Sequence, residues 1–206
     1  MVKLLTYILL FSTCSFTSDQ EIAVEESMPV SAEKTLIVYL SRTNNTKAIA
    51  ELIQKNIGGD LVALELEKPY PENYEAIVKQ VAEENETGFL PQIRTKINLN
   101  NYDTIFLGFP TWGMQLPPPI KSFLHKNDLA GKTVIPFNTN AGYGVGSSFS
   151  TVKELCANSI VLKGFSIKGG VERDGIYLVF KGDKKAEAER KVKSWLKRIN
   201  TLIIKD

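Results

Sequence analysis

The sequence predicts a three-layer, doubly wound α/β fold, with helices on both faces of an open parallel β-sheet. Apolar runs of strand length alternate with helical patterns along most of the 206 residues, which is the pattern of parallel strands joined by crossover helices. The run at residues 35–40 is apolar on both faces, as expected for a central strand between two layers of helices. Of all residues, 43% are hydrophobic and 23% are charged, a composition typical of a folded globular protein.

The first half of the folded part contains two strand-and-helix units. The strand at residues 35–40 opens the first, and Gly58-Gly59 marks the end of its helix. A second strand is expected at residues 61–66, where leucine and glutamate alternate as on a strand near the sheet edge. Apolar residues at helical spacing predict a helix after each strand: Ile49, Leu52, Ile53 and Ile57 for the first, and Tyr74, Ile77, Val78 and Val81 for the second.

The alternation continues through a third and a fourth strand. Residues 104–109 form the third, followed by a proline-rich turn and a helix around Ile120. Residues 132–137 form the fourth, followed by a glycine-rich loop and a helix at residues 149–156. Because proline cannot donate to a sheet ladder, Pro136 predicts that the fourth strand stops pairing regularly at its carboxyl end.

A split fifth strand and a long helix complete the predicted fold. The strand is divided between residues 160–162 and 165–167. The helix presents an apolar stripe in which Trp195 belongs to the core. Charges of alternating sign at residues 184–193 indicate its solvated face.

The N-terminus is predicted to direct export. Residues 4–11 form an apolar run after a positive start; this is too short to span a bilayer, which takes about 20 residues, but it suits a secretory signal. The run leads to Cys14, in an arrangement that resembles a bacterial lipoprotein signal, where the cysteine is lipidated. We therefore expect a signal peptide at residues 1–14, a flexible linker at 15–33 and a folded domain at 34–206, in a protein that is periplasmic or anchored to the membrane by lipid. Cleavage near Ser18 and a retained N-terminus are the alternatives.

Charge and composition exclude several classes of function. The chain has 25 basic and 23 acidic residues, and a net charge of +2 is too small for the basic surface of a nucleic-acid-binding protein. Two cysteines and one histidine cannot form a zinc cluster, which needs about four such ligands. If Cys14 is lipidated or removed, Cys156 is unpaired and no internal disulfide is expected.

The loops after the first, third and fourth strands are expected to carry the chemistry, because ligands bind at the carboxyl ends of strands in open parallel sheets. The first of these loops reads Ser-Arg-Thr-Asn-Asn-Thr-Lys at residues 41–47. Its hydroxyl and amide groups, next to the N–H groups of a helix start, predict a phosphate site. Capping the helix would need only one such residue. The loop lacks the glycine patterns of ATP-binding and dinucleotide-binding sites.

Four motifs in order resemble the flavodoxins. Residues 36–47 resemble the strand and phosphate loop of that family, whose usual form is Ser-Arg-Thr-Gly-Asn-Thr. The similarity continues at residues 69–74, 108–112 and 137–144, and extends over roughly residues 34–199. This resemblance implies a five-stranded sheet of order 2-1-3-4-5 that binds FMN non-covalently and passes electrons.

The resemblance also implies three groups of FMN-binding residues. The phosphate would be held, through hydroxyls and backbone N–H groups, by Ser41, Arg42, Thr43, Asn44, Asn45 and Thr46. The isoalloxazine ring would be bordered by Pro110, Thr111, Trp112, Gly113 and Met114, with Trp112 as the stacking or edge contact. The loop near the pyrimidine end would consist of Thr139, Asn140, Ala141, Gly142, Tyr143 and Gly144, with Tyr143 over the ring.

Two departures from the family pattern bear on the chemistry. Asn44 stands where the family usually has glycine, and asparagine tolerates a left-handed backbone better than most residues. Asn140 stands where related sequences often have a histidine that could donate a proton. No catalytic side chain and no metal are expected, since the flavin would supply the redox chemistry. A backbone carbonyl in the loop at residues 112–114 could turn to accept a hydrogen bond from the reduced flavin.

Three functions remain open on the sequence. The chain is an exported FMN-dependent electron carrier, an FMN-dependent NAD(P)H quinone or nitro-type reductase, or a flavin-free binding module of the same fold. Carrier flavodoxins usually have an acidic surface, which the near-neutral charge does not support. The redox partner is not identified by the sequence.

Overall fold

The structure is a computed structural model that describes residues 34–203, with side chains through residue 200. The expected signal peptide with Cys14 and the linker at residues 15–33 lie outside the described residues. The elements in chain order are β1 (Thr35–Tyr39), α1 (Asn45–Ile57), β2 (Asp60–Ala63), α2 (Tyr74–Thr87), β3 (Thr104–Pro110), α3 (Pro118–Lys126), β4 (Thr133–Asn140), α4 (Ser148–Leu155), β5 (Ile160–Val161), β6 (Phe165–Lys168) and α5 (Gly182–Ile203).

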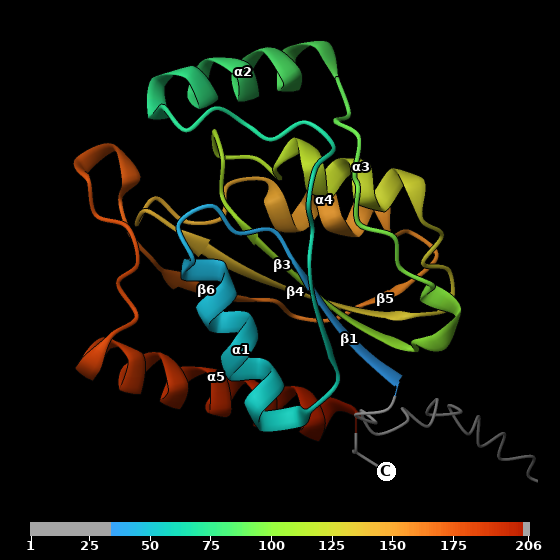
Figure 1. Cartoon of the computed structure of the whole chain (residues 1–206). Helices are drawn as coiled ribbons and strands as arrows, with labels where there is room; N and C mark the ends of the chain where they lie inside the picture. The colour runs from blue at the N-terminus through green and yellow to red at the C-terminus, as the bar shows by residue number, and fades with distance from the viewer. Residues whose placement is uncertain (1–33, 204–206) are drawn as a thin grey trace, which may run out of the picture.

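The strands form one parallel sheet, and its order confirms the predicted fold class. The order is β2-β1-β3-β4-β5, and β6 pairs with β4 beyond β5. β5 and β6 are the two halves of the expected split strand. Because all strands run the same way, the loops after β1, β3 and β4 emerge at one edge of the sheet (Figure 1).

Alternate residues of the central strand β1 pack into two separate hydrophobic cores, one on each face of the sheet. Leu36 and Val38 of β1 are fully buried in a cluster with apolar residues of α3 and α4. Ile37 points the opposite way, into a cluster with α1 and α5 that includes the buried Trp195, as predicted. Figure 1 shows α1 and α5 on one side of the sheet, and α2 farther out on the other side than α3. None of the described helices has the length and apolar character to cross a membrane.

β4 does not end its pairing at Pro136, so that prediction was wrong. The strand pairs with β3 as far as Thr139 and with β6 as far as Asn140. The backbone groups of Val134 face β5, where its carbonyl accepts from Leu162 N–H at 3.0 Å, and Pro136, two residues on, faces the same side. The missing donor of Pro136 therefore lies at the gap between β5 and β6, where the ladder is already interrupted.

Candidate functional site

A cleft of 480 Å³ lies at the carboxyl edge of the sheet. Its walls come from the loops after β1, β3 and β4, from residues 169–172 after β6, and from α2. Eleven of the residues predicted from the sequence line it: Arg42, Thr43, Asn45, Thr46, Pro110, Thr111, Trp112, Gly113, Thr139, Asn140 and Ala141. The structure does not place the other six on the cleft wall: Ser41, Asn44, Met114, Gly142, Tyr143 and Gly144.

The loop after β1 leaves backbone N–H groups open at the start of α1. Asn44 has a φ of 61°, in the left-handed region, and its side chain makes no capping hydrogen bond. The first helical bond is donated by Ala48 N–H to the Asn44 carbonyl oxygen at 3.0 Å. Lys47 N–H donates to Ser41 Oγ at 3.2 Å. The N–H groups of Asn45 and Thr46 precede the first helical bond and therefore have no partner within the helix. This arrangement suits an anion at the helix start.

The side chain of Asn45 has a structural task, so only its backbone is open to a ligand. Its Nδ2 donates to Thr43 Oγ1 and to the Tyr177 carbonyl oxygen, both at 2.9 Å. Its Oδ1 accepts from Val179 N–H at 3.1 Å. Thr43 Oγ1, which accepts from Asn45, keeps its own proton for donation. The hydroxyls of Thr46 and Thr139 are hydrogen-bonded to each other at 2.9 Å and are buried.

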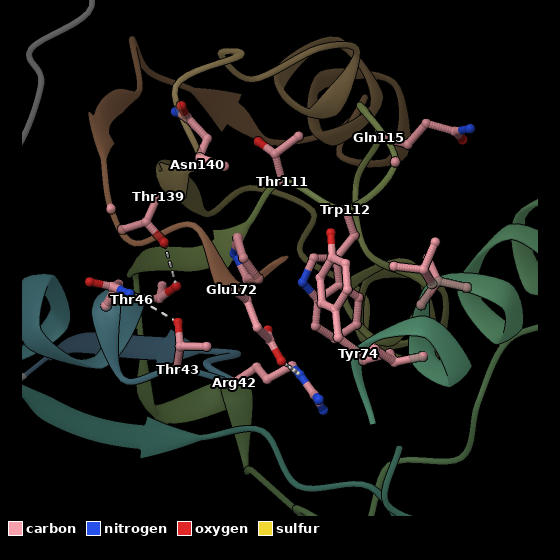
Figure 2. Close-up of a pocket in the computed structure, with 18 of the residues that line it drawn as sticks. Arg42, Thr43, Thr46, Tyr74, Thr111, Trp112, Gln115, Thr139, Asn140 and Glu172 are labelled. Carbon is pink, nitrogen blue, oxygen red and sulfur yellow. Dashed lines mark hydrogen bonds and ion pairs between the residues drawn. The ribbon is translucent and has the colours of Figure 1, made fainter. Parts of the chain in front are cut away.

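The guanidinium of Arg42 is also engaged within the protein. Its Nε lies 2.6 Å from Glu172 Oε1, and the two side chains are only 19% and 17% exposed (Figure 2). Its Nη1 and Nη2 donate to the carbonyl oxygens of Pro71 and Glu72, at 2.8 and 2.5 Å. Arg42 therefore joins three chain segments, and Glu172 pairs with its charge. Sequence reasoning missed Glu172, which is 130 residues away and carries no local signal.

Trp112 is held in place by a chain of contacts that leads to α2. Its ring packs edge-on against Tyr70, with centroids 5.3 Å apart and planes at 87°. Tyr70 donates its phenol proton to the buried carboxylate of Glu84, which also accepts from Gln80 Nε2 at 2.8 Å. Burial and the bond to Glu84 raise the pKa of Tyr70 well above its usual value. In Figure 2, Trp112 and Tyr74 both point into the middle of the cleft.

A tight turn follows Trp112. Gly113 and Met114 have φ values of 56° and 58°, and Trp112 and Gln115 exchange backbone hydrogen bonds of 3.3 and 3.0 Å, which defines a type I′ turn. The Met114 carbonyl accepts from Ser147 N–H at 3.0 Å. In the described part of the chain, the peptide between Gly113 and Met114 has no such partner. Turning it over would give a type II′ turn, which needs only glycine at its first central position.

Asn140 stabilises the loop after β4 through hydrogen bonds from both the nitrogen and the oxygen of its side-chain amide. Its Nδ2 donates to Asn138 Oδ1 and Ser166 Oγ, at 3.1 and 3.0 Å. Its Oδ1 accepts from Gly142 N–H and Gly144 N–H, at 2.9 and 3.2 Å. With four hydrogen bonds the amide has no spare capacity, so Asn140 does not substitute for a proton-donating histidine.

α2 forms a wall of the cleft that sequence reasoning did not assign to the site. Its lining residues follow helical spacing along one face: Tyr74, Ile77, Val78, Val81, Ala82, Asn85 and Glu86. Val78 is 49% exposed although it is apolar. The adjacent apolar residues Ile77 and Val78 make the apolar stripe of α2 wider than a single row of side chains. This width was the one sequence feature that could have indicated a second contact surface on α2. Gln115, Gly169 and Gly170 are further lining residues that were missed.

Comparison with known proteins points to one family. A family model described as flavodoxin matches residues 34–180. A protein from Bacteroides uniformis, provisionally named a flavoprotein, is 26% identical with a TM-score of 0.65, over 80% of this chain and 97% of that chain. A similarly named protein from Bacteroides eggerthii is 29% identical with a TM-score of 0.62, over 81% and 97%. A flavoprotein from Lactobacillus acidophilus, solved in complex with FMN, is 27% identical with a TM-score of 0.59, over 66% and 93%. No curated protein matches the chain.

Proposed function

This chain belongs to the flavodoxin family, and we propose that it binds FMN non-covalently in the cleft and passes electrons through the flavin. The observation that carries the proposal is the left-handed Asn44, which keeps the N–H groups at the start of α1 open beside a cleft of ligand size. The similarity to a flavoprotein solved with FMN supports it.

The phosphate would lie at the start of α1. Backbone N–H groups of Asn45 and Thr46 and the hydroxyl of Thr43 would donate to its oxygens. Arg42 would border this place with its charge matched by Glu172, and three of its five N–H groups are donated to Glu172 and to two carbonyl oxygens. Because the charge of Arg42 is paired within the protein, the phosphate would depend mainly on these neutral donors and on the partial positive charge of the helix start.

The isoalloxazine ring would lie between the loops after β3 and β4. Trp112 would contact it, held in one orientation by Tyr70. When bound, FMN would supply the redox chemistry, and the protein would orient it and limit the access of water. The unpartnered peptide of Gly113 and Met114 could turn its carbonyl toward the ring at little cost to the rest of the turn, since both neighbouring peptides are held.

A reductase remains the second candidate, and one observation favours it. The face of α2 adds an apolar wall to the cleft beside the loops that would bind the flavin. The cleft thus extends from these loops to α2, and this part of it would hold a small electron acceptor next to the ring. A carrier that docks another protein has no need of this space.

The phosphate subsite can be tested by comparing FMN with riboflavin, which lacks the phosphate. Thr43→Val should weaken FMN by about tenfold or more and leave riboflavin almost unchanged, because a hydrogen bond to a charged group is worth about 1.5–3 kcal/mol. Dissociation constants from flavin fluorescence titration measure both. Equal losses for the two flavins would contradict the phosphate role, and a wild-type protein that takes up no FMN would support the flavin-free binding module.

A further inference from the structure

A lysine behind the cleft orients two side-chain amides that border it. Lys121 of α3 donates from Nζ to Asn85 Oδ1 at 2.9 Å and to Gln115 Oε1 at 3.4 Å. Because an ammonium group can only donate, both amides must present their oxygens to it. Asn85 Nδ2 and Gln115 Nε2 are then left without an acceptor among the described residues, and both residues line the cleft.

These two donors lie at the end of the cleft opposite the phosphate loop. Arg42 ties the residues just before α2 to the phosphate loop, and Asn85 lies 11 residues beyond Tyr74, or about 16 Å along the helix. Figure 2 shows Gln115 and Thr43 on opposite sides of Trp112. The donor pair is therefore separate from the place proposed for the phosphate.

Apolar side chains of α2 line the cleft between these ends. Ile77, Val78 and Val81 of α2 all line it, but Ile77 and Val81 are buried, and Val78, at 49% exposed, offers the free apolar surface. Side chains of this kind gain from covering a flat ring, by about 25 cal/mol for each Å² removed from water. The apolar face and the two amide donors together match a ring that carries a hydrogen-bond acceptor.

The charges near the donor pair favour a neutral ligand. Lys121 places one positive charge behind the amides, while the carboxylate of Glu86 also lines the cleft one residue from Asn85. A ligand carboxylate would share the cleft with the negative charge of Glu86, whereas a carbonyl oxygen would accept from the amides without that repulsion.

We propose that Asn85 and Gln115, oriented by Lys121, bind a carbonyl oxygen of a flat, uncharged ring that lies against α2. The inference rests on the proposed function, because the ring is either the flavin itself or a quinone-like electron acceptor beside it. Binding of the ring is non-covalent, so no covalent bond is made or broken.

Equilibrium dialysis of the purified, FMN-loaded protein against 1,4-naphthoquinone and against naphthalene tests the acceptor. The two probes share a ring system and differ in the carbonyl groups. Asn85→Asp keeps the contact with Lys121 but removes the free donor. Asn56→Asp on α1, where Asn56 donates to the Leu52 carbonyl away from the cleft, makes the same change of charge and amide as a control. FMN and riboflavin titrations of the same proteins test the flavin.

Wild type and Asn56→Asp should bind naphthoquinone about tenfold more tightly than naphthalene, and Asn85→Asp should lose this preference. A loss of about tenfold for both FMN and riboflavin in Asn85→Asp alone would also support the donor pair and would identify the flavin as the ring. If Asn85→Asp changes neither quinone preference nor flavin affinity, the inference is overturned. Failure of the wild type to bind FMN would overturn the proposed function instead, and the naphthoquinone comparison in the flavin-free protein would still decide whether the donor pair acts.

Discussion

At the scale of single residues, the pairing of Arg42 with Glu172 determines how the cleft would bind an anion. A free arginine in the phosphate loop would add a full positive charge, but here the charge is matched by a carboxylate 2.6 Å away. A phosphate bound there would therefore meet neutral donors beside an arginine whose charge is already paired. Neutral donors hold a phosphate less tightly than a cation does, and they add no positive charge near the reacting ring.

This pairing makes a prediction for Glu172→Gln. Glutamine keeps an acceptor oxygen for Arg42 but removes the negative charge, so the net charge near the start of α1 becomes more positive. Affinity for FMN should rise by about tenfold at low salt, and affinity for riboflavin should not change. Titrations at low and high ionic strength measure the effect, since added salt should reduce it. A parallel rise for riboflavin would show that the change does not act through the phosphate.

Burial of Cys156 is expected to make the stability of the protein depend on pH. Cys156 is buried among apolar residues at the C-terminal end of α4, and burial raises the pKa of its thiol to about 11. Because the folded state holds this proton more tightly than the unfolded state, the contribution to stability is complete below about pH 8.5 and is lost as the pH rises toward 11. The loss approaches about 1.4 kcal/mol for each pH unit between these values.

Urea unfolding at pH 8 and pH 10 should therefore show a fall in stability that is smaller in Cys156→Ala. The substitution also leaves a small cavity, which lowers stability at both pH values, so the comparison concerns the difference between the two pH values. An identical difference in the wild type and the variant would show that Cys156 does not cause the pH dependence.

At the scale of elements, the packing between β3 and β4 depends on a close approach. Gly108 of β3 pairs with Phe137 of β4, and a Cβ added to Gly108 would lie 2.1 Å from the Phe137 ring. The ring therefore occupies the space that any side chain at residue 108 would need. Both residues sit in the strands whose loops bound the cleft, so this contact helps to set the spacing of those loops.

Gly108→Ala should destabilise the protein by about 1–3 kcal/mol, the usual cost of overpacking a dense core. Urea denaturation measures the loss. Adding Phe137→Leu, which removes the colliding ring atoms, should recover part of it, and the two effects should be non-additive because the residues touch. Additive losses would mean that the strain lies elsewhere.

At the scale of the whole molecule, the folded domain carries the cleft, and the N-terminal residues are expected to decide where it works. The apolar run at residues 4–11 and Cys14 support the proposal of a lipid-anchored, exported protein. In a bacterial host, the protein should be found in the membrane fraction, and Cys14→Ala should release it to the soluble fraction. Fractionation and immunoblotting measure this. Soluble protein in both cases would contradict lipidation.

Local patterns predicted most of the fold. Strand and helix positions follow from apolar spacing within short windows, and the parallel sheet of order β2-β1-β3-β4-β5 agrees with the order that the family resemblance implied. The loops expected to carry the chemistry do meet at one edge of the sheet. Pro136 was misread because the loss of a donor matters only if another strand needs it, and the position of the gap between β5 and β6 is not visible in the sequence.

The sequence by itself determined which segments become strands and helices and which of their faces are apolar, because those properties depend on neighbours along the chain. Only the tertiary structure decided what lies against each apolar face, because hydrophobic burial has no direction of its own. The apolar face of α2 thus lines the cleft, although the same spacing would fit a helix packed on the sheet. For the same reason the sequence could not show that Arg42 would meet Glu172, or that Lys121 would bind the oxygens of two amides that line the cleft.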